Sequence, residues 1–136
     1  MKDKKTILKN QIEGFLKKEQ LLKKEEYKKL EKPYLTKARK NLTVANIMNS
    51  ISDQEELKKM LNLANNFEMY DWVIIVSYYA MYTSALSALA KLEFKSKSHA
   101  ATITVLELNY INQSNKNRKN LETKDIHKLT KAYTLS

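Results

Sequence analysis

The chain has 136 residues, with one glycine, one proline, no cysteine and a formal net charge of +10. This length suffices for one domain with one core, and the lack of cysteine excludes disulfides and thiol chemistry. Turn residues are too scarce for a β-sandwich or barrel, and a single glycine cannot make a P-loop or a GxGxxG motif. We therefore expect an all-α protein: an up-and-down bundle of four to five core helices over residues 35–136, preceded by a basic, Lys/Glu-rich helical extension over residues 1–34.

The N-terminal stretch, residues 4–31, is predicted to be helical. Its apolar residues are sparse but recur at helical spacing, and Gly14 weakens the pattern enough that two shorter helices are an alternative. The stretch should end before Pro33, because proline disfavours helical geometry at the residue that precedes it. A second helix is then predicted over residues 35–48.

The second helix is predicted to break at residues 49–52, three of which are Asn or Ser. Ser52 with Glu55 three residues later has the pattern of a capping box, which predicts that a third helix starts there and runs to residue 66. Its inward face is expected to consist of four residues: Leu57, Met60, Leu61 and Ala64.

The central helix is predicted over residues 70–92. Its first half is apolar around almost the whole circumference, which indicates a helix surrounded by neighbours. The 19 uncharged residues from Trp72 to Ala90 are long enough to cross a bilayer. Seven of the 19 are Ser, Thr or Tyr, however, which favours the buried helix of a soluble bundle without a membrane partner. The N-terminus has no signal-peptide pattern, so a cytoplasmic protein is expected.

Two further helices and no β-sheet complete the expected fold. Ser98 is a favourable N-cap for a helix over residues 99–111. A polar loop over residues 112–120 leads to a last helix, from residue 123 to the end of the sequence.

Positive charge is concentrated at the two ends of the sequence. Residues 1–40 hold 14 Lys or Arg against 6 Asp or Glu, residues 41–110 hold 5 against 7, and residues 111–136 hold 6 against 2. A solvated lysine-rich surface accounts for this pattern without any ligand. The alternative is weak, sequence-independent and salt-sensitive binding of nucleic acid through the basic ends.

The string SYYAMYTSALSALAKLEFKSKSH, residues 77–99, resembles the signature of small prokaryotic HEPN-domain proteins. In that family a helix with a YYAM tyrosine pair is followed by Lys-Ser-His at the start of the next helix. The matching residues here are Tyr78 and Tyr79, and then residues 97–99. The stretch KARKNLTVA, residues 37–45, is similar to the family's first core helix, so the resemblance covers about residues 35–110. It implies a helical bundle that is often a homodimer.

The resemblance implies one of two kinds of activity. One branch of the family consists of metal-independent ribonucleases, commonly toxins, whose signature is Arg followed after four to six residues by His. The other branch lacks that signature and binds a partner, often a minimal nucleotidyltransferase encoded beside it in a toxin–antitoxin or related module.

The ribonuclease signature is absent from this chain. Neither Arg39 nor Arg118 is followed by His at that spacing, and His127 lies nine residues beyond Arg118. That chemistry needs an imidazole to move a proton beside a guanidinium that holds the phosphate. We therefore expect no catalytic residue and no cofactor. A metal site is not expected either, because His99 and His127 lie in separate segments and there is no cysteine.

The candidate binding residues surround the HEPN-like signature. Tyr78 and Tyr79 are predicted mainly as core packing, and a hydroxyl that reaches a ligand is the alternative. His99 follows the predicted N-cap and is either a surface residue or a phosphate contact at a helix N-terminus. The full set of candidates is Lys95, Lys97, Ser98, His99, Tyr78, Tyr79 and Arg118.

The sequence thus predicts a binding protein, the partner of a nucleotidyltransferase-type protein in a module associated with nucleotides, RNA or other nucleic acid. The alternatives are a ribonuclease toxin with a non-standard or lost motif, and a structural homodimerisation module. Apolar surface near one end of the central helix is expected to stay open and to be closed by a second copy or a partner. In the competing arrangement, residues 4–31 fold back over it.

Overall fold

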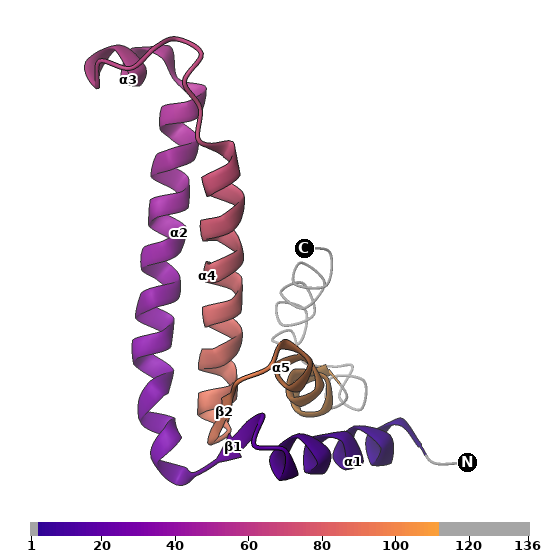
Figure 1. The fold of residues 1–136 in the computed structure, drawn as a ribbon. Coiled ribbons are helices and arrows are strands. Elements are labelled where there is room, and N and C mark those ends of the chain that lie inside the picture. The colour runs from indigo at the N-terminus through magenta and orange to yellow at the C-terminus, as the bar shows by residue number, and fades with distance from the viewer. Residues whose placement is uncertain (1–2, 112–136) are drawn as a thin grey trace, which may run out of the picture.

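Two long antiparallel helices stand side by side; a short helical segment connects them at one end, and the remaining elements pack across the other end (Figure 1). The computed structural model describes residues 3–111. The elements are α1 (Lys4–Lys17), β1 (Leu21–Lys23), the 3-10 helix η1 (Glu25–Leu30), α2 (Glu31–Asp53), α3 (Glu55–Met60), α4 (Tyr70–Lys91), β2 (Phe94–Ser96), α5 (His99–Leu106) and the π-helix η2 (Glu107–Ile111). The all-α bundle is confirmed. The predicted last helix and Arg118 lie outside the described residues.

Small side chains let α2 and α4 pack closely. Ala38 and Ala45 of α2 and Ala80 of α4 are all buried. We call α2 and α4 together the hairpin. One serine hydroxyl forms a hydrogen bond between its two halves near each end. Ser87 Oγ donates to the Glu31 carbonyl at 2.8 Å, and Ser52 Oγ accepts from the Met69 N–H at 2.7 Å. The hairpin is therefore held by close backbone approach rather than by large interlocking side chains.

The hydrophobic core lies at the base of the hairpin. Its six buried members come from five different elements of the chain: Ile12, Leu21, Leu89, Phe94, Ala101 and Val105. Residues of the expected N-terminal extension and residues of the bundle therefore share one core. Helix α1 contacts α5 and η2 and does not run along α4, so residues 4–31 do not cover the open face of the central helix.

The prediction of one continuous helix over residues 4–31 is wrong, and so is the prediction of no β-sheet. The chain leaves α1 through Glu19, which has a positive φ of 56°. It then enters a short antiparallel ribbon in which Leu21 pairs with Ser96 and Lys23 pairs with Phe94. Leu21 is fully buried there, so the burial gained by pairing with a distant segment overrides local helix propensity. Gly14 lies inside α1, so the helix does not end at this glycine.

Helix α2 is longer at both ends than the predicted 35–48. Pro33 is its third residue. A proline is tolerated in the first helical turn because its missing N–H would have had no partner within the helix. At the other end, residues 49–52 remain helical and the predicted capping box is wrong. Ser52 Oγ donates to the Met48 carbonyl at 2.8 Å instead of capping α3, which begins after Gln54.

Helix α4 begins where the central helix was predicted to begin and ends one residue earlier than predicted, but its first half is not surrounded by neighbouring helices. Among the residues described, Trp72, Ile74 and Ile75 are 58%, 70% and 43% exposed. Of the described helices, only α4 has the length and apolar composition to span a membrane. A core helix meets the same criterion, and Ala80 and Ser87 on the side that faces α2 are buried.

A phenol–carboxylate hydrogen bond joins Tyr70 to Asp53 at the distal end of the hairpin. This bond raises the pKa of the Tyr70 phenol, with smaller contributions from partial desolvation and from the Asp53 and Glu68 charges. The bond's contribution to stability should be present below the ordinary phenol pKa near 10 and should be lost as the pH rises through the higher pKa of the folded state. We expect Asp53→Asn to lower the Tyr70 pKa in NMR titrations of ring-labelled tyrosine. The control Asp71→Asn should leave it unchanged, and an unmoved Tyr70 pKa in Asp53→Asn would contradict this assignment.

Candidate functional site

The most chemically distinctive surface lies where the start of α5 meets the middle of α4. The Tyr78 hydroxyl forms a hydrogen bond with His99 Nε2. The His99 ring stacks on Tyr82, with centroids 4.5 Å apart and an interplanar angle of 14°. Tyr79 meets Tyr78 edge to face at 5.9 Å. We call these four residues, Tyr78, Tyr79, Tyr82 and His99, the Tyr–His cluster.

The cluster forms because the two segments are placed by separate local signals. Tyr78 and Tyr82 are four residues apart on α4, so their rings share a face and stack with centroids 6.4 Å apart. Ser98 caps α5 as predicted, and its Oγ accepts from the Ala101 N–H. Buried Thr102 holds the turn by donating from Oγ1 toward Ser96 Oγ, at 2.8 Å. This network fixes His99 in the first turn of α5, against α4.

A groove between α2 and α4 continues from the cluster. It has a volume of about 330 Å³, and Tyr79 and Tyr82 line it together with Tyr34, Lys37 and Asn41. Tyr79 is 54% exposed, so the prediction of core packing is wrong for this residue, whereas Tyr78 is half-buried. The cluster therefore offers accessible aromatic faces with a lysine and an amide beside them.

The predicted lysines do not join the cluster. Lys95 Nζ lies 5.9 Å from the centroid of the Tyr27 ring, in the basic surface around η1 and the ribbon. Lys97 is exposed, and its backbone N–H donates to the Gln20 carbonyl. Within residues 3–111, the hydrogen-bond and ring-stacking partners of His99 are tyrosines, and no Lys or Arg is among them. Arg118, the remaining candidate, lies outside the described residues.

Tyr82 is the cluster member that the candidate set from the sequence lacks. Its position four residues after Tyr78 was the available signal, since residues at that spacing lie on one face of a helix. The stacking partner could not be identified from the sequence, because it depends on where α5 lies relative to α4.

The Tyr78–His99 pair can share a proton, but the described residues do not supply the rest of a phosphoryl-transfer site. With a neutral imidazole, Nε2 accepts the phenolic hydrogen and Nδ1 carries the ring proton. Stabilising a developing phosphate charge would also need an adjacent cation. Arg39, the arginine among the described residues, is exposed on α2 and is not one of the hydrogen-bond or stacking partners of His99. The geometry suits recognition through stacking and hydrogen bonds.

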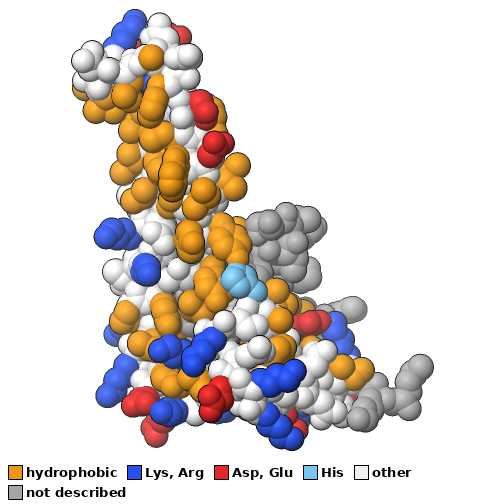
Figure 2. Space-filling model, viewed as in Figure 1, with side chains coloured by type: hydrophobic (Ala, Val, Ile, Leu, Met, Phe, Trp, Pro, Cys, Tyr) orange, Lys and Arg blue, Asp and Glu red, His pale blue; other side chains and the backbone are white. Residues whose placement is uncertain are grey.

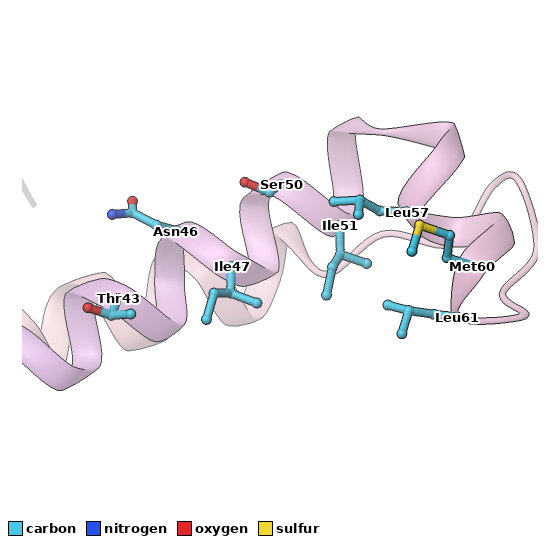
Figure 3. Close-up of a pocket in the computed structure, with 8 residues that line it drawn as sticks. All are labelled: Thr43, Asn46, Ile47, Ser50, Ile51, Leu57, Met60 and Leu61. Carbon is cyan, nitrogen blue, oxygen red and sulfur yellow. The ribbon is translucent and has the colours of Figure 1, made fainter.

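A second hollow lies at the elbow between α2 and α3, on the side of α2 away from α4 (Figure 3). It has a volume of about 550 Å³ and no ionisable lining residue; it is lined by Thr43, Asn46, Ile47, Ser50, Ile51, Leu57, Met60 and Leu61. Met60 and Leu61 are 80% and 54% exposed, so their predicted inward placement is wrong. Lys58 is buried beneath this turn, where its Nζ donates to the Asn65 carbonyl at 3.0 Å.

No family model, no curated protein and no solved structure matches this chain. Within residues 3–111 there is also no group of three or more His, Asp or Glu side chains that could hold a metal ion.

Proposed function

We propose that this chain is a HEPN-type binding protein that uses the Tyr–His cluster and the adjoining groove to contact a nucleotidyltransferase-type protein. One observation carries the proposal. The two parts of the signature on which the resemblance rests, at Tyr78 and at His99, are 21 residues apart in sequence and are in direct contact in the fold. That contact supports reading the two weak motifs as one recognition surface.

The composition of this surface favours a protein partner. Tyrosine is enriched at interfaces because a rigid apolar ring is combined with a hydroxyl that can form a hydrogen bond at the rim. Tyr79 presents an exposed ring, and Lys37 and Asn41 add polar groups around the groove. The groove is lined mainly by aromatic and apolar side chains with a single lysine, which is unlike a phosphate-binding site.

The proposal is tested by measuring affinity for a minimal nucleotidyltransferase, the kind of enzyme that the resemblance implies as a partner. We expect complex formation and at least a tenfold weaker Kd for Tyr79→Ala, because truncating an interface anchor costs about 2 kcal/mol or more. Ile7→Ala is the matched control: Ile7 is 45% exposed on α1, away from the cluster, and the variant should bind normally. If both variants bind the nucleotidyltransferase with equal affinity, the Tyr–His cluster is not part of the interface.

A second arm of the experiment tests the ribonuclease alternative with the same purified protein. Total RNA incubated with the protein and EDTA should stay intact, because no guanidinium joins His99 in the described part of the chain. Metal-independent cleavage that disappears in His99→Ala would show that the Tyr–His cluster is catalytic, and would overturn the binding proposal.

A further inference from the structure

Helix α4 carries a second stripe of uncharged side chains, on a side that does not face α2. Its members recur at alternating steps of four and three residues: Tyr70, Ile74, Ser77, Met81, Ser84 and Ala88. We call these residues the second stripe. It lies about 110° round the helix from Ala80 and Ser87, which are buried on the side that faces α2. The repeat is that of a helix packed lengthwise against another helix, so it predicts a second helical neighbour for α4.

No described helix covers the distal part of the second stripe. Ile74 is 70% exposed, and Tyr70 is 41% exposed. Helix α2 runs along another side of α4, whereas η1, β2 and α5 contact α4 from about its middle towards the base (Figure 1). Figure 2 shows exposed apolar side chains along the distal part of the hairpin and positive side chains concentrated around the base. A continuous apolar surface of this kind usually marks an interface.

The described chain ends at the foot of the second stripe. Tyr110 of η2 donates its hydroxyl hydrogen to the Ala88 carbonyl at 2.8 Å, and Ala88 is the member of the stripe nearest the base. The 25 residues after Ile111 therefore start beside it. Residues 123–136, for which the sequence predicts a helix, would be about 21 Å long at 1.5 Å per residue. The stripe from Ala88 to Ile74 is about 21 Å long by the same measure, so the two lengths match.

Residues 123–136 also have the pattern and the charge of an occupant for this stripe. Ile126, Leu129 and Tyr133 recur at steps of three and four residues, which places them on one face of a helix. The chain that follows η2 holds six Lys or Arg against two Asp or Glu. Residues 41–79, the distal hairpin with its connecting turn, hold two lysines against five carboxylates. The opposite net charges favour contact between the two.

From this position, length and pattern we propose that residues 123–136 form a helix that packs antiparallel to α4 along the second stripe. Ile126 then lies level with Ser84, and Tyr133 lies level with Ser77. Each large side chain meets a small one, as close packing of two helices requires. The occupant of this exposed face is thus the chain itself and not a second molecule.

This inference goes beyond the proposed function and does not depend on it. Tyr79, which lines the groove beside the Tyr–His cluster, is half a turn of α4 away from the second stripe. The docked helix therefore leaves that groove accessible to a partner. For the same reason the docking is tested on the purified chain alone, and its failure would leave the proposed function standing.

Paired cysteines test the docking and its register, since the natural chain has none to interfere. Ser77→Cys combined with Tyr133→Cys should form a disulfide within one chain under mild oxidation, with the loss of both free thiols. The control pair, Tyr79→Cys with Tyr133→Cys, has the same height on the opposite side of α4 and should keep both thiols. Two free thiols in the Ser77 pair would overturn the proposal. Disulfide-linked dimers would also overturn it, because they would make a second copy the occupant.

A second measurement tests whether the apolar face of the segment is buried. Leu129→Asp should lower the Tm by several degrees, because it places a carboxylate against the stripe without a partner. Thr134→Asp introduces the same charge on the other side of the predicted helix and should leave the Tm unchanged. Thermal unfolding followed by circular dichroism compares the two variants, and equal Tm values for them would overturn the proposal.

Discussion

Replacing Leu89 with alanine should lower the free energy of unfolding by about 2–5 kcal/mol. Leu89 is fully buried and belongs to the same cluster as Leu21 of β1 and Val105 of α5. Truncation therefore opens a cavity where the hairpin, the ribbon and α5 meet. Because α1 reaches the hairpin mainly through this cluster, the loss should destabilise the whole base and not α4 alone.

Chemical denaturation followed by far-UV circular dichroism measures this effect. Leu42→Ala is the matched control: the same substitution in α2, at a side chain that is 53% exposed, should cost much less. Equal destabilisation by the two substitutions would mean that the core is not centred on Leu89. Two separate unfolding transitions for the wild type would show that the hairpin and the base do not fold as one unit.

Replacing Ser52 with alanine should cost about 1–3 kcal/mol, a large effect for the loss of one hydroxyl. Ser52 is only 3% exposed, and its Oγ accepts a hydrogen bond from the backbone N–H of Met69, the residue that precedes α4. Alanine would leave that N–H without its partner in a partly buried position. It would also release the link that joins the end of α2 to the start of α4.

Ser84→Ala is the control that separates the two hydrogen bonds of Ser52. Ser84 Oγ donates to the Ala80 carbonyl at 2.9 Å within its own helix, just as Ser52 Oγ donates to the Met48 carbonyl. The control thus loses the local bond and keeps every bond between helices, and it should be close to neutral. If Ser84→Ala destabilises the protein as much as Ser52→Ala does, the bond to Met69 contributes nothing measurable.

Local signals in the sequence were sufficient wherever an element is defined within a few residues. The long run without a charged residue predicted α4 with nearly its observed bounds, and Ser98 caps α5 as its residue type and position predicted. The tyrosine pair and His99 were also singled out from the sequence. Helix periodicity and capping are properties of neighbouring residues, so a single sequence contains the information needed to find them.

The tertiary structure decided everything that depends on a distant partner. Leu21 lies in a strand because Ser96 is there to pair with it, although its neighbours favour a helix. Ser52 stays inside α2 because its hydroxyl bonds to Met69, 17 residues away, although its pattern with Glu55 is that of a cap. The stacking of Tyr82 on His99 likewise depends on the position of α5 against α4. In each case, a contact between segments far apart in the sequence outweighs a local preference worth at most about 1 kcal/mol.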